Sequence, residues 1–145
     1  MPKHQASVVI SRPVEEVFAY MNDVSREAEW QPQLIEAEQT PPGPTQVGSR
    51  RRYVSEFLGK RVENRYVVLV YEPNRRVVLR TTPDSALNAT SEVVWESEGE
   101  GTRVTMKLDG APSGPLRFIP GALLEASFEK EVRGTLARLK ERLEA

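Results

Sequence analysis

Cysteine is absent from this 145-residue chain, and histidine occurs only once. The absence of cysteine excludes disulfide frameworks, thiolate zinc sites, iron–sulfur clusters and a cysteine nucleophile. The single histidine, His4, excludes a multi-histidine metal site. Its place in a terminal segment that we expect to fray also argues against a Ser-His-Asp triad. We therefore expect no metal and no cofactor.

An excess of charge of one sign and a long apolar run are also missing. The chain has 20 Lys and Arg against 21 Asp and Glu, a net charge of −1, so it has no overall field that would hold a polyanion. We therefore expect no nucleic-acid partner. No apolar run approaches the roughly 18 residues of a transmembrane span, and no signal peptide begins the chain. The sequence predicts a soluble cytoplasmic protein with one domain over residues 1–145.

Two short helices are expected directly after a first strand at residues 7–10. Apolar residues within 14–21 recur at i, i+3, i+4 and i+7, which is the pattern of one helical face. Ser11 is a candidate N-cap for this helix. Ser25 is a candidate cap for a second, very short helix that ends at Trp30, before a proline prevents its continuation.

Strand patterns fill the middle of the chain. Placing tight turns at residues 59–60, 73–74 and 99–100 separates apolar from charged residues on every strand, whereas a one-residue slip would mix them. The first of these hairpins sets Tyr53 opposite Tyr66. We expect a curved antiparallel sheet of about seven strands, with one wet face and one apolar face.

The later hairpins make specific predictions as well. The second pairs Val70 with Val77 and points Val78 outward. The third pairs Trp95 with Val104 on the inner face and sets opposite charges against each other on the outer face, which favours pairing.

A long helix is expected at the end of the chain. Pro120 suits its first turn, and apolar residues recur along one face as far as Leu143. The other face is rich in Glu and Arg, and we assign Glu125, Glu129 and Glu131 to a solvated surface. Together these elements predict an α+β fold with the sheet wrapped round the last helix.

Five features of the sequence belong together: the opening ISRPVEEVF at 10–18, Asp23, the EWQP at 29–32, the VGSR at 47–50 and the Trp95 strand. With these features the chain resembles the START-like (SRPBCC) superfamily, and its polyketide cyclase/dehydrase-like branch in particular. The resemblance covers nearly the whole chain. It implies a helix-grip fold with a cavity between sheet and C-terminal helix, and in this superfamily such a cavity usually takes an apolar small molecule such as a lipid, sterol, polyketide or quinone.

The expected inner face supplies candidate ligand-binding residues. It mixes aromatic side chains with small polar ones, as ligand cavities do, whereas a filled core would more often carry Val, Ile or Leu. The candidates also include a residue after the second short helix and residues near the start of the last helix. They are Trp30, Arg51, Tyr53, Ser55, Phe57, Asn64, Tyr66, Ser91, Trp95, Met106, Phe118, Leu124 and Phe128.

The polar candidates have alternative interpretations. Tyr53 and Tyr66 are either proton donors or an aromatic cross-strand pair, and we favour the pair. A buried Asn64 amide needs a water or a ligand as its partner. Because an unpaired buried cation is costly, Arg51 should lie at the cavity rim or bind an acidic ligand group.

The apolar candidates have alternatives too. Trp30 either lies at the cavity entrance or closes the end of the barrel, and we favour the second. Trp95 and Met106 also suit plain core packing. Phe118 and Phe128 form either a lid over the cavity or an anchor for the last helix.

Three functions fit these patterns. The first is binding of an apolar or aromatic small molecule, such as a lipid, quinone or polyketide-like compound, without chemistry. The second is a cyclase or dehydratase in which Tyr53, Tyr66 or Arg51 donates protons or stabilises an oxyanion. The third is a protein-interaction or stress-response module that acts through its outer surface. A homodimer is compatible with each of them.

Overall fold

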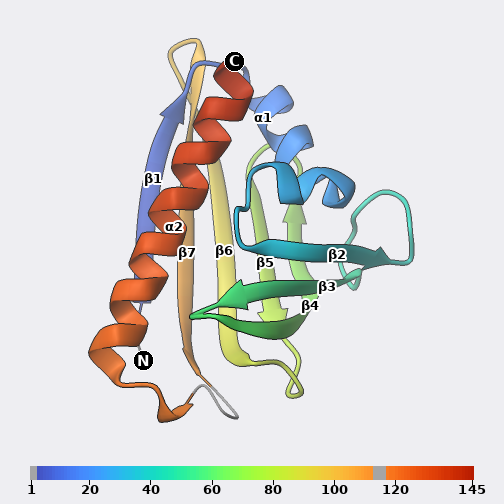
Figure 1. Ribbon diagram of the computed structural model, residues 1–145. Coiled ribbons are helices and arrows are strands. Elements are labelled where there is room, and N and C mark those ends of the chain that lie inside the picture. The colour runs from blue at the N-terminus through green and yellow to red at the C-terminus, as the bar shows by residue number, and fades with distance from the viewer. Residues whose placement is uncertain (1–2, 113–116) are drawn as a thin grey trace.

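The computed structural model describes residues 3–112 and 117–145 (Figure 1). Its main elements follow one another in the order that the sequence patterns predict: a strand, two short helices, six further strands and a long helix. They are β1 (Lys3–Ile10), α1 (Val14–Met21), the 3-10 helix η1 (Val24–Glu29), β2 (Leu34–Thr40), β3 (Arg50–Phe57), β4 (Lys60–Glu72), β5 (Arg76–Thr81), β6 (Leu87–Glu98), β7 (Gly101–Pro112) and α2 (Gly121–Glu144).

The described strands form one antiparallel sheet of seven, in the order β1-β7-β6-β5-β4-β3-β2. Strands β2 and β3 run across the direction of β1, β7 and β6, so the sheet is strongly curved (Figure 1). Helix α2 lies along β1 within this curve, while α1 and η1 lie at one end. This is the helix-grip arrangement that the sequence predicts.

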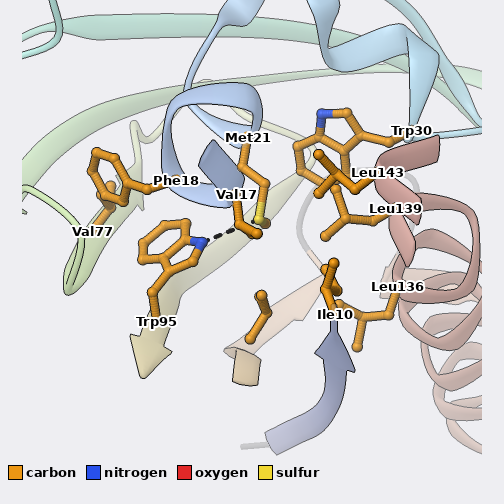
Figure 2. Close-up of a cluster of buried hydrophobic side chains, with 11 residues drawn as sticks. Ile10, Val17, Phe18, Met21, Trp30, Val77, Trp95, Leu136, Leu139 and Leu143 are labelled. Atoms are coloured by element: carbon orange, nitrogen blue, oxygen red, sulfur yellow. Dashed lines mark hydrogen bonds between the residues drawn. The ribbon is translucent and has the colours of Figure 1, made fainter. Parts of the chain in front are cut away.

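The apolar face of α2 packs at its two ends in different clusters. The C-terminal half contributes Leu136, Leu139 and Leu143 to the main core, which also takes side chains from α1 and the sheet (Figure 2). The N-terminal half contributes Leu124 and Phe128 to a second, smaller cluster. The middle of α2 lies between the two clusters, and this is where the cavity described below is found.

The register of the first hairpin differs from the prediction by two residues. Strand β3 pairs Tyr53 with Asn64, and Tyr66 lies opposite Arg51. The turn is made by Leu58 and Gly59, whose φ angles of 52° and 77° are the positive values that a tight hairpin turn requires. Leucine rarely adopts a positive φ angle, so the residue type at position 58 did not suggest a turn there. A shift of two residues keeps the side chains of β3, and those of β4 as far as Val68, on their predicted faces.

The second hairpin is predicted correctly near its open end and wrongly near its turn. Val68 pairs with Leu79 as expected, but a bulge follows, and Val70 then lies opposite Val78 instead of Val77. The bulge places Val70, expected on the inner face, on the outer face with Val78. Val78 lies on the predicted outer face but is only 7% exposed. The third hairpin, including the pair Trp95 and Val104, has the predicted register.

The first strand is longer than predicted, and His4 belongs to it. His4 pairs with Leu108 of β7, and its ring makes an edge contact with Phe128 at 5.6 Å between centroids. The predicted helix caps are also wrong. Pro13 takes the N-cap position of α1, and the Asp23 carboxylate caps η1 by accepting the Ser25 N–H at 3.1 Å.

Candidate functional site

A cavity of about 200 Å³ lies between the curved sheet and the middle of α2. Its walls come from η1, from strands β3 to β7 and from one face of α2, so residues far apart in the sequence meet there. The lining residues are Met21, Asn22, Glu27, Trp30, Gln31, Arg51, Tyr53, Ser55, Phe57, Val62, Asn64, Tyr66, Leu79, Leu87, Ser91, Val93, Trp95, Met106, Lys107, Leu108, Phe128, Glu131, Val132 and Thr135.

All but two of the predicted site residues line this cavity. The exceptions are Phe118 and Leu124. Phe118 is 77% exposed, with the Arg117 guanidinium over its ring, so it neither covers the cavity nor anchors the helix. Leu124 is buried, but against Phe57 and Phe128 in the smaller cluster. Phe118 precedes α2 and Leu124 lies in its first turn, so both come before the part of the helix that faces the cavity.

The residues that line the cavity are Trp30, Arg51, Tyr53, Ser55, Phe57, Asn64, Tyr66, Ser91, Trp95, Met106 and Phe128. The two tryptophans also belong to the main core, and the Trp95 indole N–H points to the Met21 sulfur at 3.2 Å (Figure 2). Trp30 is buried without a hydrogen-bond partner for its indole N–H among the described residues. Core packing and cavity lining are therefore combined in the same side chains.

A buried carboxyl group that the sequence analysis missed lies in the cavity wall. Glu27 of η1 is 2% exposed. Its Oε1 accepts a hydrogen bond from the Tyr53 hydroxyl at 2.7 Å, and its Oε2 accepts one from the Gln31 amide at 2.5 Å. Burial raises the pKa of Glu27 to about 7, against the opposing effects of the Arg51 charge and these two hydrogen bonds. Glu27 can therefore gain or lose a proton near neutral pH.

Arg51 lies on the inner face, as predicted, but it is satisfied by protein groups. It is 4% exposed, and its Nε donates to Gln39 Oε1 at 3.0 Å. Its Nη2 donates to Thr45 Oγ1 at 3.0 Å and to Asn22 Oδ1 at 3.3 Å. These neutral oxygens hold the guanidinium at one end of the cavity, so an acidic ligand is not required to bury it.

The two tyrosines form the predicted aromatic pair. The rings of Tyr53 and Tyr66 make an edge contact at 5.7 Å between centroids. The two residues are diagonal neighbours on adjacent strands and do not lie directly opposite each other. Burial raises the pKa of Tyr66 to about 12 and raises that of Tyr53 well above its usual value. Both hydroxyls therefore keep their protons at physiological pH. Tyr53 already donates its proton to Glu27, whereas the Tyr66 hydroxyl has no partner among the described residues.

Asn64 finds its partner within the chain. Its side-chain oxygen accepts the backbone N–H of Leu87 at 3.0 Å, where β6 begins. The expected water or ligand is thus not needed for this oxygen. Asn64 instead ties the start of β6 to β4 on the cavity side of the sheet.

Glu131 was expected at the solvated surface, and this was wrong. It lines the cavity from α2, and burial raises its pKa to about 7. Position 131 lies three residues after Phe128 and four before the buried Thr135, which places it on the apolar face of the helix. This spacing could have identified Glu131 from the sequence, because a lone carboxylate within an apolar stripe is unusual.

Comparison with known proteins assigns the chain to a family. Residues 1–144 match the model of the family described as polyketide cyclase / dehydrase and lipid transport. The chain belongs to this family. A search of curated proteins finds no match.

Solved structures with the same fold include several START and cyclase proteins. The Zhui aromatase/cyclase from a Streptomyces species is 16% identical over 99% of this chain and 93% of its own, with a TM-score of 0.81. A START superfamily protein from Mycobacterium smegmatis is also 16% identical, over 98% of this chain and 97% of its own, with a TM-score of 0.81. The protein TTHA0849 from Thermus thermophilus is 22% identical over 97% of this chain and 99% of its own, with a TM-score of 0.75. At these identities the likeness concerns the fold.

The cavity of this polyketide cyclase/dehydrase family member contains a few polar groups among aromatic side chains. Glu27 can exchange a proton near pH 7, Tyr53 can donate a hydrogen bond, and Glu131 adds a second carboxyl group. Among the described residues, no three His, Cys, Asp or Glu side chains group in a way that could hold a metal ion. None of the described helices is long and apolar enough to cross a membrane.

Proposed function

We propose that this protein binds an apolar or aromatic small molecule in the cavity beneath α2 and acts as a carrier or binding protein. One observation supports this above all. The helix packs tightly against the sheet at both ends, yet its middle faces a cavity lined by aromatic side chains with a few polar groups between them. Ligand sites have this composition, whereas a purely structural core would fill the space.

The size of the cavity limits the ligand. A cavity of about 150 Å³ in an engineered core takes benzene, and sites for drug-sized ligands begin at roughly 300 Å³. At about 200 Å³ this cavity suits one or two fused rings or a short acyl chain. A quinone head group, a small aromatic polyketide or part of a lipid is of this size.

Filling the cavity should abolish binding. We expect Ser91→Phe, which places a ring inside the cavity, to lose the thermal shift and the mass-spectrometric complex that naphthoquinone or short fatty acids give with the native protein. Thr90→Phe is the matched control, because the neighbouring residue of β6 lies on the outer face beside Arg80. Equal ligand binding by both variants would contradict the proposal, as would no binding by the native protein.

A cyclase or dehydratase activity in the same cavity is the second candidate, and the Glu27–Tyr53 pair favours it. A carboxyl group with a pKa near 7 is suited to general acid–base catalysis. When Glu27 is protonated, it can donate to the Tyr53 oxygen, and the Tyr53 proton, otherwise held by Glu27, could then be donated to a developing oxyanion. A structural neighbour is named as an aromatase/cyclase.

Catalysis by this pair predicts specific losses of turnover. With a reactive aromatic polyketide precursor, Glu27→Gln should lower kcat by roughly 10²- to 10⁴-fold, the usual contribution of a general acid or base. Tyr53→Phe should lower it less. Glu29→Gln, on the same short helix but outside the cavity lining, should leave it unchanged. Unchanged turnover in the first two variants would remove these catalytic assignments and leave binding as the function.

A role as a protein-interaction or stress-response module, a homodimer and a cytoplasmic location stay predictions from the sequence. The outer face of the sheet carries ion pairs between neighbouring strands, such as Arg52 with Glu63 at 3.0 Å. Pairs of this kind suit a solvated surface, so the cavity remains the feature on which we base the function.

A further inference from the structure

The charged groups around the cavity differ in whether the protein itself satisfies them. Arg51 donates hydrogen bonds to three side-chain oxygens, and Glu27 accepts from Tyr53 and Gln31. Their opposite charges also act on each other, since Arg51 lowers the pKa of Glu27. Lys107 is exposed to water and lies 3.8 Å from the Glu92 carboxylate, which also pairs with Arg76. None of these groups requires a ligand.

Glu131 is the contrast. Among the described residues, its carboxyl group has no hydrogen bond and no ion pair, and burial alone perturbs it. Other carboxylates of α2 are exposed or paired, as Glu129 is with Arg133 at 2.9 Å. A half-buried carboxyl group without a partner costs stability, because it gives up water without gaining a hydrogen bond. The cavity is the space into which a partner could come.

The surroundings of Glu131 suit a positive partner. Tyr66 is close enough for the Glu131 charge to raise its pKa, and its hydroxyl has no hydrogen-bond partner within the described residues. The faces of aromatic rings attract cations, and Tyr66, Phe57 and Phe128 line the same cavity. An aromatic wall with one unpaired carboxylate is the arrangement that recognises an organic ammonium group.

We propose that the ligand is an aromatic or apolar molecule that carries a protonated amine, and that the ammonium group pairs with the Glu131 carboxylate beneath α2. This inference rests on the proposed function, because it names the chemical class that the same cavity would take. The ring system lies against the aromatic lining, and the amine replaces the missing partner of Glu131. A ligand with an acidic tail would instead meet two cations that already have partners, Arg51 on three side-chain oxygens and Lys107 beside Glu92.

The test uses probes that differ only in the tail. 2-(2-Naphthyl)ethylamine, 2-(2-naphthyl)ethanol and 2-naphthylacetate share the two-ring body and are compared by calorimetric titration at pH 8, above the pKa of Glu131. We expect the amine to bind roughly tenfold or more tightly than the alcohol, which is the usual advantage of a hydrogen bond to a charged group. The acetate should bind most weakly.

Variants assign this preference to one residue. Glu131→Gln should remove the advantage of the amine and leave the affinity for the alcohol unchanged. Glu125→Gln is the matched control, since it makes the same charge change on an exposed position of α2 and should alter neither affinity. The ranking of the three tails by the native protein tests the inference even if Glu131→Gln fails to fold.

The possible outcomes distinguish a failure of amine recognition by Glu131 from a failure of small-molecule binding as the function. Equal binding of amine and alcohol, or tightest binding of the acetate, would overturn the amine proposal while supporting an apolar cavity. An amine preference that survives in Glu131→Gln would overturn the role of Glu131. If none of the three probes binds, the proposed function fails and the inference fails with it.

Discussion

Glu27→Gln should remove about 3 kcal/mol of pH dependence from the free energy of unfolding. Burial raises the pKa of Glu27 from 4.5 to about 7 in the folded protein, and each unit of pKa difference corresponds to about 1.4 kcal/mol. Because the folded pKa is the higher one, the folded state binds the proton more tightly. The stabilisation is complete below pH 4.5 and is lost as pH rises through 7. The native protein should therefore lose stability between pH 5 and 8, and the variant should lose less.

Urea denaturation at several pH values between 5 and 9 measures this effect. Carboxylates whose pKa is lowered in the folded protein, such as Glu98 beside Arg103, stabilise the fold until the pH falls through their folded pKa. That pKa lies below pH 5, so these groups do not change the free energy of unfolding within this range. Glu29→Gln is the control, because Glu29 lies two residues away, has a lowered pKa and pairs with Arg26. Parallel pH profiles for Glu27→Gln and the native protein would show that Glu27 is not the group responsible.

Glu131 should add a second contribution of the same sign, since burial also raises its pKa to about 7. A Glu27→Gln/Glu131→Gln double variant should therefore show a flatter profile than either single variant.

The fold was predictable because each strand separates polar from apolar residues. The alternation that places Tyr53, Ser55 and Phe57 on one face holds for any register that differs by an even number of residues. For that reason the faces were correct although the first hairpin was shifted. Leu58 in a positive-φ turn carries no signal in its residue type, and the bulge after Val68 changes the pairing without a glycine to mark it.

The cavity wall was predictable for the same reason, and its carboxyl groups were missed for different ones. Glu27 lies in a 3-10 helix of six residues, too short for a periodic pattern to reveal which side faces inward. Glu131 had a usable signal, because it falls among the apolar positions of a 24-residue helix. Glu131 has the same residue type as the exposed Glu125 and Glu129, and residue type alone does not show that it lies on the other face of the helix.

Arg51→Met should destabilise the protein by about 3 kcal/mol at pH 8. The variant removes the guanidinium donor from Gln39, Thr45 and Asn22, although Gln39 Oε1 still accepts the Thr45 hydroxyl at 2.9 Å. A fully buried polar group that loses its hydrogen bond costs about 1–3 kcal/mol. Because these three groups are only partly buried, we expect their combined cost to be about 3 kcal/mol, the upper value for a single fully buried group. Arg50→Met, the same change at the neighbouring exposed position of β3, should cost less than about 0.5 kcal/mol.

The cost of losing Arg51 should also depend on pH, because its charge lowers the pKa of Glu27. Without Arg51, Glu27 takes up its proton at a higher pH, and the ionised form becomes more costly to bury. We therefore expect Arg51→Met to be less destabilising at pH 5, where Glu27 is protonated in either protein, than at pH 8. In the Glu27→Gln background the difference between the two pH values should disappear. Equal costs at both pH values, with additive effects in the double variant, would mean that the two groups do not interact. A cost that depends on both pH and Glu27 would establish that the buried cation and the buried carboxyl group form one electrostatic unit at this end of the cavity.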